Sequence, residues 1–197
     1  MTNKLFVSLA SVSALLTASP GAADPIDIVN PSFESPELSP GAFTIGDFDG
    51  WSTVDIAGVF YPVSFEFNLP LPDGNQVGYA NFGTGQLSQT LSATLQSNTT
   101  YTLTVWVGSR LDCCNPNPYS VSLFAGDQLL DSESSQQPDP GDFALSTITF
   151  TSDDGDPREG LPLQIVLNSY GTGQTAFDNV SLDATPVGRK PSSPSGR

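Results

Sequence analysis

The stretch Thr100-Tyr101-Thr102-Leu103-Thr104-Val105-Trp106-Val107 decides the fold class, because apolar and polar residues alternate along it almost without interruption. Successive side chains of a β-strand point to opposite faces. One predicted face, expected to join the core, carries Tyr101, Leu103, Val105 and Val107. The threonines and Trp106 lie on the other face, where a tryptophan is a sugar-stacking platform, part of a subunit interface, or covered by a loop.

Similar short runs recur along the chain, separated by Gly, Pro, Asn and Asp, and no long helical periodicity appears. The predicted strands are 26–29, 51–55, 58–61, 75–81, 87–91, 100–109, 119–125, 128–131, 143–151, 162–169 and 175–182. Many short strands with turn residues between them predict an all-β fold, an antiparallel β-sandwich of the jelly-roll type.

The two ends of the chain differ from this body in composition. Residues 1–23 have the positive start, short apolar run and final small residues of a signal peptide, which predicts a secreted or periplasmic protein. That run is too short to span a bilayer, and no second apolar stretch approaches transmembrane length. Residues 185–197 have the composition of a flexible tail. Residues 24–184 are therefore expected to form one jelly-roll domain.

The charge of this domain is strongly negative. It holds all 21 acidic residues of the chain but only Arg110 and Arg158 of the six basic ones, so its formal charge is 2 minus 21, or −19. Such a surface repels nucleic acid and anionic membranes, and we expect neither as a partner. It suits divalent cations, neutral ligands such as sugars, and cationic or apolar small molecules. Plain solubility of an exported protein is the alternative explanation.

Several kinds of catalytic site are excluded by composition. The chain has no histidine, and no lysine occurs between Lys4 and Lys190. Histidine triads, histidine-ligated zinc and Schiff-base lysines are therefore ruled out, and acid–base chemistry must depend mainly on Asp, Glu or Tyr. The neighbouring Cys113 and Cys114 cannot join distant parts of the fold, and form a vicinal disulfide or remain free thiols.

One acidic residue falls where a buried strand residue is expected, in Phe177-Asp178-Asn179-Val180-Ser181-Leu182. Regular alternation puts Asp178 on the same, core-facing side as Val180 and Leu182. A carboxylate there needs a cation, hydrogen-bond donors or a raised pKa, since an unpaired buried charge is very costly.

Glu34 is the second carboxylate that the topology can bring to this point. The first and last strands of a jelly roll commonly lie side by side, so Glu34 and Asp178 are expected to converge. Two carboxylates with backbone carbonyls would suit Ca²⁺. The alternative is that Glu34 lies on the surface and Asp178 caps a strand end.

Several segments together resemble known families. Asn30-Pro31-Ser32-Phe33-Glu34, Gly50-Trp51 and the closing stretch 177–182 look like the galactose-binding-like jelly roll of family 4 and 9 carbohydrate-binding modules, which carry a structural calcium. A narrower resemblance, from about residue 30 to residue 184, is to the Stig cyclases. The segments that carry it are 72–80, 87–91, 99–103, 107–111 and 178–183.

The resemblance to the Stig cyclases, exported cyanobacterial enzymes, implies a calcium-dependent homodimer that acts on a small apolar indole-terpene substrate. That substrate is an isonitrile-bearing geranyl indole of hapalindole-, fischerindole- and ambiguine-type pathways. The reaction is a Cope rearrangement, a cyclisation and a terminal electrophilic aromatic substitution.

Carried over residue by residue, the resemblance makes Asp178 the candidate general acid and Tyr79 its hydrogen-bonding partner. A carboxyl on an apolar face has a raised pKa and can stay protonated near neutrality. The rest of the pocket should be aromatic and apolar. The residues expected to line it are Trp51, Phe60, Tyr61, Phe65 and Phe67.

Asp178 cannot easily be both an ionised calcium ligand and a protonated acid. If it is the acid, calcium must use Glu34, backbone carbonyls and other carboxylates such as Asp183 or Asp27. Two other classes of function stay open: a non-catalytic secreted carbohydrate-binding protein with Trp106 as its platform, and an exported structural protein with no small ligand.

Overall fold

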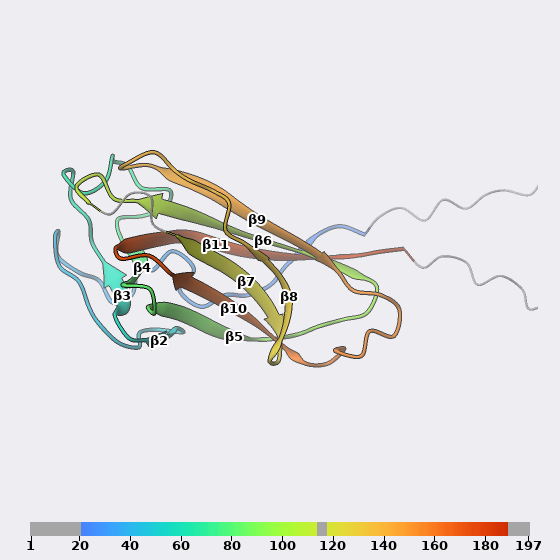
Figure 1. Cartoon of the computed structure of the whole chain (residues 1–197). Helices are drawn as coiled ribbons and strands as arrows, with labels where there is room; N and C mark the ends of the chain where they lie inside the picture. The colour runs from blue at the N-terminus through green and yellow to red at the C-terminus, as the bar shows by residue number, and fades with distance from the viewer. Residues whose placement is uncertain (1–20, 114–117, 189–197) are drawn as a thin grey trace, which may run out of the picture.

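The computed structural model describes residues 21–113 and 118–188. The predicted all-β jelly roll is confirmed: two antiparallel sheets pack face to face (Figure 1). One sheet has the order β3-β4-β11-β6-β9, with β1 beside β11, and consists of β1 (Asp24–Pro25), β3 (Ala57–Phe60), β4 (Val77–Asn81), β6 (Thr99–Ser109), β9 (Phe143–Thr151) and β11 (Gln174–Pro186). The other has the order β2-β5-β10-β7-β8 and consists of β2 (Ser52–Val54), β5 (Gln86–Thr94), β7 (Tyr119–Ala125), β8 (Gln128–Glu133) and β10 (Pro162–Ser169).

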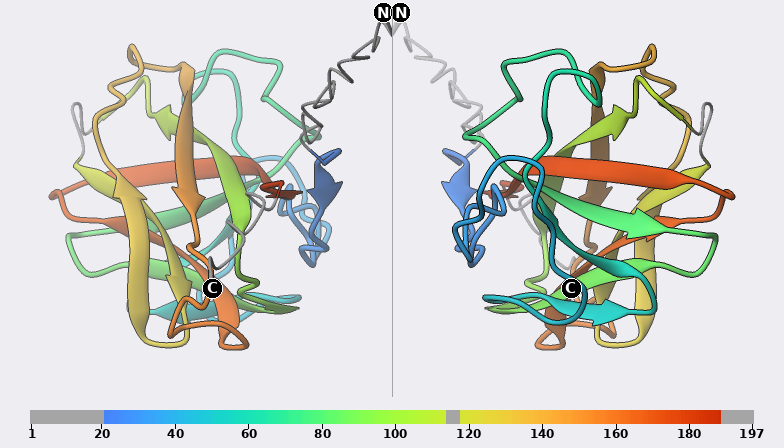
Figure 2. Two further views of the ribbon diagram at one scale, coloured as in Figure 1. Left: turned by 90° about the vertical axis from the view of Figure 1, so that its right-hand side faces the viewer. Right: turned by 90° about the vertical axis from the view of Figure 1, so that its left-hand side faces the viewer.

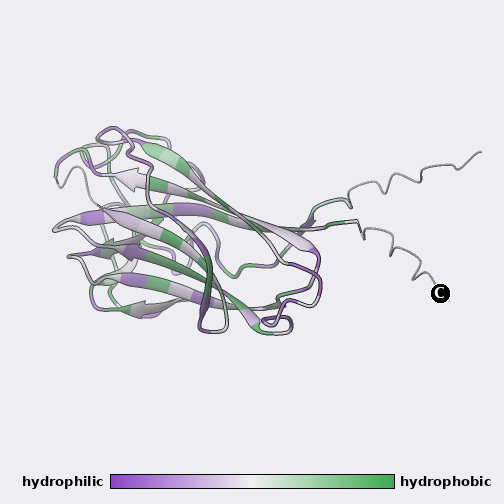
Figure 3. Ribbon diagram, turned by 45° about the vertical axis from the view of Figure 1, so that its right-hand side comes forward, coloured by the Kyte–Doolittle hydropathy of each residue, from purple (hydrophilic) through white to green (hydrophobic). Residues whose placement is uncertain are grey.

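The core lies between the two sheets, where the alternation predicted it. Apolar and polar residues alternate along the strands (Figure 3), and the apolar set of β6 is at most 1% exposed. The facing sheet contributes Val121 and Leu123 from β7 and Leu163, Ile165 and Leu167 from β10. The threonines and Trp106 of β6 therefore face outward, on the outer face of the six-stranded sheet.

The predicted strands match the observed ones except at the N-terminal end. β1 pairs Asp24 with Ala184, so the first and last strands lie side by side as expected (Figure 2, dark blue and dark red). The segment 26–29 is not a strand, and that prediction is wrong. The backbone N–H of Val29 donates to Oε1 of Gln89, a side chain of the other sheet, so the chain leaves the ladder here.

β11 continues to Pro186, which pairs with Thr99, so the sheet extends two residues beyond the expected start of the tail. The rest of the predicted tail from residue 189 lies outside the described residues, as do the first 20 residues of the predicted signal peptide. In the described ranges no helix is long and apolar enough to cross a membrane. Cys113 is disulfide-bonded, and Cys114 lies outside the described residues.

A β-bulge in β11 decides which way Asp178 points. Asp178 pairs with Trp106 and Ser181 pairs with Thr104, so three steps along β11 match two along β6. The extra residue is accommodated by a left-handed backbone at Asn179, with φ of 46°. Asp178 therefore shares the outer face with Trp106, and the expectation that it faces the core is wrong.

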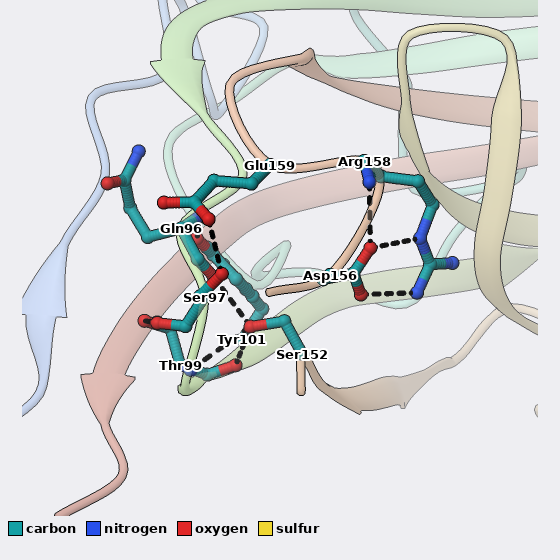
Figure 4. A network of polar contacts seen from close by, with 8 residues as sticks. All are labelled: Gln96, Ser97, Thr99, Tyr101, Ser152, Asp156, Arg158 and Glu159. Carbon is teal, nitrogen blue, oxygen red and sulfur yellow. Dashed lines mark hydrogen bonds and ion pairs between the residues drawn. The ribbon is translucent and has the colours of Figure 1, made fainter. Parts of the chain in front are cut away.

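A network of polar contacts (Figure 4) lies at the end of the sandwich opposite β3 (Figure 1). The Tyr101 hydroxyl accepts a hydrogen bond from the Gln96 backbone N–H at 2.7 Å. Nearby, Arg158 forms a 2.7 Å ion pair with Asp156. Hydrogen bonds from the Arg158 side chain and backbone lower the pKa of Asp156 to about 2, so this carboxylate is ionised at neutral pH.

Candidate functional site

The outer face of the six-stranded sheet carries two rows of side chains beside β3 and β4. The first row runs across four strands and consists of Gly58, Tyr79, Ala176 and Gly108. The second, which we call the polar row, consists of Asn81, Gln174 and Arg110. Asn81 pairs with Gln174 across β4 and β11, and Arg110, just after β6, donates from Nη1 to Oε1 of Gln174 at 2.9 Å.

The segment 41–46 covers one side of these rows. It adds to the edge of β3, where the Thr44 N–H donates to the Val59 carbonyl at 2.8 Å. The carbonyl of Thr44 lies where a side chain at residue 58 would be, 2.2 Å from an ideal Cβ, so only glycine fits at Gly58. The Tyr79 hydroxyl donates to this same carbonyl at 2.7 Å. Burial raises the pKa of Tyr79 to about 12, and the hydroxyl stays protonated.

Between this segment and the polar row lies a hollow of about 380 Å³. The residues that line the hollow are Gly41, Phe43, Ile45, Ile56, Phe60, Glu66, Tyr79, Asn81, Arg110 and Gln174. The rings of Phe43 and Phe60 each meet the Tyr79 ring edge-on, at centroid distances of 6.5 and 6.4 Å. Phe43 and Ile45 are about 60% exposed and form an apolar rim, so the hollow suits an apolar ligand with an aromatic ring.

Arg110 organises the polar end of the hollow. Its guanidinium forms an ion pair of 2.9 Å with Glu66, and a two-pronged pair with Asp112. It also lies 5.5 Å from the centroid of the Phe60 ring. The hydrogen bond to Asp112 is the largest of the effects that raise the pKa of Arg110. This cation is therefore balanced by carboxylates of the chain itself.

A small apolar cluster packs on the sheet beside the hollow. Its buried members are Phe60, Phe67, Leu71, Val77, Tyr79 and Ala176. Phe67 stacks on Phe143 at 5.1 Å. An ideal Cβ at Gly108 would lie 2.4 Å from the Phe143 ring, so the missing side chain there lets this layer sit close to the sheet.

A separate acidic site contains Glu34, Asp73 and Asp178. Asp178 is fully buried, and its two oxygens accept the backbone N–H groups of Asp73 at 2.9 Å and Asn179 at 2.7 Å. The pKa of Asp178 is raised to about 7, chiefly by burial. The two N–H donors oppose this rise, and the nearby carboxylates of Asp73 and Glu34 add to it.

Glu34 is held by the loop that also binds Asp178. Its Oε1 accepts the backbone N–H groups of Asn75 and Gln76, each at 2.8 Å. An ideal Cβ at Gly74 would lie 2.2 Å from this oxygen, so the loop wraps closely around the carboxylate. Glu34 and Asp178 converge as predicted, and Asp73 joins them.

The other predicted metal ligands lie elsewhere. Asp183 pairs with Pro25 and Thr102 beyond the bulge of β11, and Asp27 is exposed. In the described part of the chain, no group of three or more Asp, Glu or Cys side chains is arranged to hold a metal ion. A cation at Glu34 and Asp178 would therefore need backbone oxygens or water as well.

The predicted catalytic pair is not a hydrogen-bonded pair. The Tyr79 hydroxyl donates to the Thr44 carbonyl, and both Asp178 oxygens accept backbone N–H groups. The residue across the ladder from Tyr79 is Ala176. Asp178 does not line the hollow. The expected hydrogen bond is therefore wrong.

Of the five aromatic residues predicted to line the pocket, Phe60 does so. Tyr61 borders a neighbouring hollow of about 300 Å³. Trp51 belongs to the main core, where its ring lies 5.1 Å from that of Phe33. Phe67 is fully buried, and Phe65 is 64% exposed.

Sequence reasoning missed most of the lining. The clearest signal was Arg110, one of two basic residues in an acidic domain. Asn81 and Gln174 gave a weaker signal, as polar residues at the end of one predicted strand and just before another. No sequence signal marked Phe43, Ile45 and Ile56, because the residues next to them in sequence do not distinguish the rim of a pocket from ordinary packing.

A family model described as HpiC1 cyclase, of the HpiC1-like family, matches residues 24–183. The chain belongs to the HpiC1-like cyclase family. The predicted relation to the Stig cyclases, and the prediction of a Stig-type cyclase enzyme, are thereby confirmed.

Solved structures agree with this family assignment. The Stig cyclase Fisc from Fischerella sp. TAU, in complex with (3Z)-3-(1-methyl-2-pyrrolidinylidene)-3H-indole, is 32% identical with a TM-score of 0.76, and the match covers 85% of this chain and 100% of that one. A cyclase from Fischerella sp. TAU in complex with 4-(1H-indol-3-yl)butan-2-one is 32% identical with a TM-score of 0.75, at the same coverage.

More distant structures share the fold alone. The carbohydrate-binding module TmCBM61, in complex with β-1,4-galactotriose, is 15% identical with a TM-score of 0.50, covering 78% of this chain and 94% of that one. No curated protein matches the chain. Trp106, the residue on which a sugar-binding role depended, is half-buried between Asp178 and Leu145.

Proposed function

We propose that this HpiC1-like cyclase converts an isonitrile-bearing geranyl indole by Cope rearrangement, cyclisation and terminal electrophilic aromatic substitution, the reaction that the Stig resemblance implies. The observation that carries the proposal is the hollow, with its apolar wall of Phe43, Phe60 and Tyr79 and its polar row at one end. Two related cyclase structures contain indole ligands, which supports an indole substrate.

The lining suits this chemistry in two ways. Apolar walls hold a flexible terpene chain in a folded, reactive conformation and keep water from cationic intermediates. The exposed ring of Phe43 can stabilise positive charge as it develops. Both effects favour an intramolecular rearrangement over hydrolysis.

Glu66 is our candidate for proton transfer. Terminal aromatic substitution releases a proton, and a carboxylate beside the reacting ring can accept it. Glu66 lines the hollow and is held by Arg110 at one oxygen and by the Val63 N–H at the other. Asp178, the candidate from sequence, lies outside the hollow, and its surroundings favour a different role.

We propose that Asp178 and Glu34 bind a structural Ca²⁺ together with backbone oxygens, with Asp73 beside them. Carboxylate and carbonyl oxygens are the ligands that this ion prefers, and the acidic site offers three carboxylates that repel one another without a cation. The ion would fix the loop at residues 73–76 against β11. It would take no part in the cyclisation.

We also propose that the protein is exported to the periplasm or out of the cell, and that it forms a homodimer. The first rests on the signal-peptide composition of residues 1–23, and the second on the Stig resemblance alone.

The experiment that tests the cyclase proposal is incubation of the purified protein with the isonitrile-bearing geranyl indole, with calcium present. Chromatography with mass detection should find tetracyclic isomers of the substrate that are missing from boiled-protein controls. If only unreacted substrate is recovered at every pH from 6 to 8, the cyclase proposal is wrong.

A further inference from the structure

Gln174 presents an unused hydrogen-bond donor at the hollow. Its Oε1 accepts from Arg110 at 2.9 Å. A guanidinium can only donate, so this bond fixes which end of the amide faces Arg110. The Nε2 group has no partner among the described residues. Because Gln174 lines the hollow, these N–H groups are available to a ligand there.

Asn81, which lies directly opposite Gln174, has a hydrogen-bond acceptor without a partner. Its side-chain Oδ1 is buried and has no hydrogen-bond partner within the described chain. The backbone of Asn81 is already paired, since its N–H donates to Ile56 and its carbonyl accepts from Gly85. A buried acceptor without a donor is unusual in a folded protein. A bound ligand could provide the donor that the described residues do not.

The two amides are close enough to serve one ligand. Residues directly opposite in an antiparallel pair have Cβ atoms about 5 Å apart. One amide offers a donor and the other an acceptor, so the matching ligand carries one acceptor and one N–H. Arg110 is balanced by Glu66 and Asp112, so this end of the hollow does not call for an anion.

We propose that Asn81 and Gln174 form hydrogen bonds with the two polar groups of an indole substrate. Asn81 lines the hollow with its Oδ1 buried, so its amide turns to bring this oxygen to the indole N–H. Gln174 Nε2 donates to an acceptor on the substituent at C3. This inference rests on the proposed function. The acceptor is the terminal carbon of an isonitrile, whose lone pair accepts hydrogen bonds, or a carbonyl oxygen. Arg110 is the positioning residue that orients Gln174.

A binding experiment with a non-reacting probe tests the inference without turnover. The probe is 4-(1H-indol-3-yl)butan-2-one, which has one N–H and one carbonyl. Its two analogues are the N-methylindole ketone, which lacks the N–H, and 3-butylindole, which lacks the carbonyl. Calorimetry should show the wild type binding the probe about 3- to 10-fold more tightly than either analogue, the value of one hydrogen bond.

Two variants assign each preference to its residue. Gln174→Leu should bind the probe and 3-butylindole equally while keeping its preference for N–H over N-methyl. Asn81→Leu should show the reverse. Gln164→Leu, on the outer face of the other sheet, should bind all three compounds as the wild type does. If Gln174→Leu fails to fold by circular dichroism, Gln174→Met replaces it.

The inference is overturned if the wild type binds the three compounds alike, or if both preferences persist in both variants. A protein that shows the predicted preferences but makes no cyclised product refutes the cyclase proposal alone. A protein that makes product but shows no such preferences refutes only the binding roles proposed for Asn81 and Gln174.

Discussion

Ala176, and not Asp178, lies directly across the ladder from Tyr79. An alanine can neither donate nor accept a proton, and the Tyr79 hydroxyl is committed to the Thr44 carbonyl. Asp178 is two residues further along β11, beneath the loop that carries Asp73. The hollow and the acidic site are therefore distinct, which is why we assign cyclisation to the first and calcium to the second.

Calcium is the first prediction. If Glu34 and Asp178 bind it, saturating calcium should raise the melting temperature by about 5 to 10 °C over protein in chelator, for an ion at 100 times its dissociation constant. Glu34→Gln and Asp178→Asn should lose this difference, because each removes a ligand charge. Asp27→Asn and Asp183→Asn are the matched controls and should keep it. Scanning calorimetry that shows no difference in wild type would refute the site.

The second prediction concerns pH in the presence of chelator. The pKa of Asp178 is raised to about 7 in the folded state, so between about pH 4 and 7 the folded chain holds a proton that the unfolded chain releases. The free energy of unfolding should therefore fall as pH rises through this range and level off above it, with a slope of at most about 1.4 kcal/mol per pH unit from this group.

Urea unfolding at pH 5, 6, 7 and 8 measures this slope. Asp178→Asn should flatten it, because the amide does not titrate. A variant with the same slope as wild type would show that another group is responsible.

The third prediction concerns Arg110. Arg110→Met removes the contacts to Glu66 and Gln174, and should cost about 2 kcal/mol of unfolding free energy. It should also reduce the preference for the indole ketone over 3-butylindole, since Gln174 is no longer oriented. Arg158→Met is the control, because Arg158 also pairs with a carboxylate and lies over a ring, at the other end of the sandwich. Equal effects of both variants on ligand preference would contradict the positioning role.

The fourth prediction concerns Glu66. Glu66→Gln keeps the shape and one acceptor oxygen but cannot take up the released proton. Product formation should slow by about 100-fold while binding of the non-reacting indole ketone changes little. Quenched-flow or endpoint assays give the rate and calorimetry gives the affinity. An unchanged rate would remove Glu66 from the mechanism.

The strands of the sandwich were predictable because alternation depends only on neighbouring residues, as in Thr100–Val107. The direction of Asp178 was not, because it depends on one extra residue at Asn179, and a bulge leaves the composition of the strand unchanged. The neighbouring first and last strands were predictable from topology, but Glu34 lies beyond β1 and is brought near Asp178 by the loop at residues 73–76, which binds both carboxylates.

The hollow was not predictable, because it is built by contacts between segments far apart in the chain. Segment 41–46 reaches the sheet only because Gly58 has no side chain to block it. Trp51 and Phe60 have the same aromatic character in sequence, yet one lies in the core and the other lines the hollow. Only the three-dimensional arrangement separates them.

The most direct test of the cyclase account fills the hollow and asks whether product is lost. Ile56 lines it and is 38% exposed, whereas Val54, two residues away, is 49% exposed on the outer face of the other sheet. The measurement is the rate of product formation from the isonitrile-bearing geranyl indole by Ile56→Trp and Val54→Trp. We predict at least about a tenfold loss for Ile56→Trp and a wild-type rate for Val54→Trp, since one added ring occupies substrate volume only in the first. Equal rates in two folded variants would contradict the assignment of the hollow as the active site.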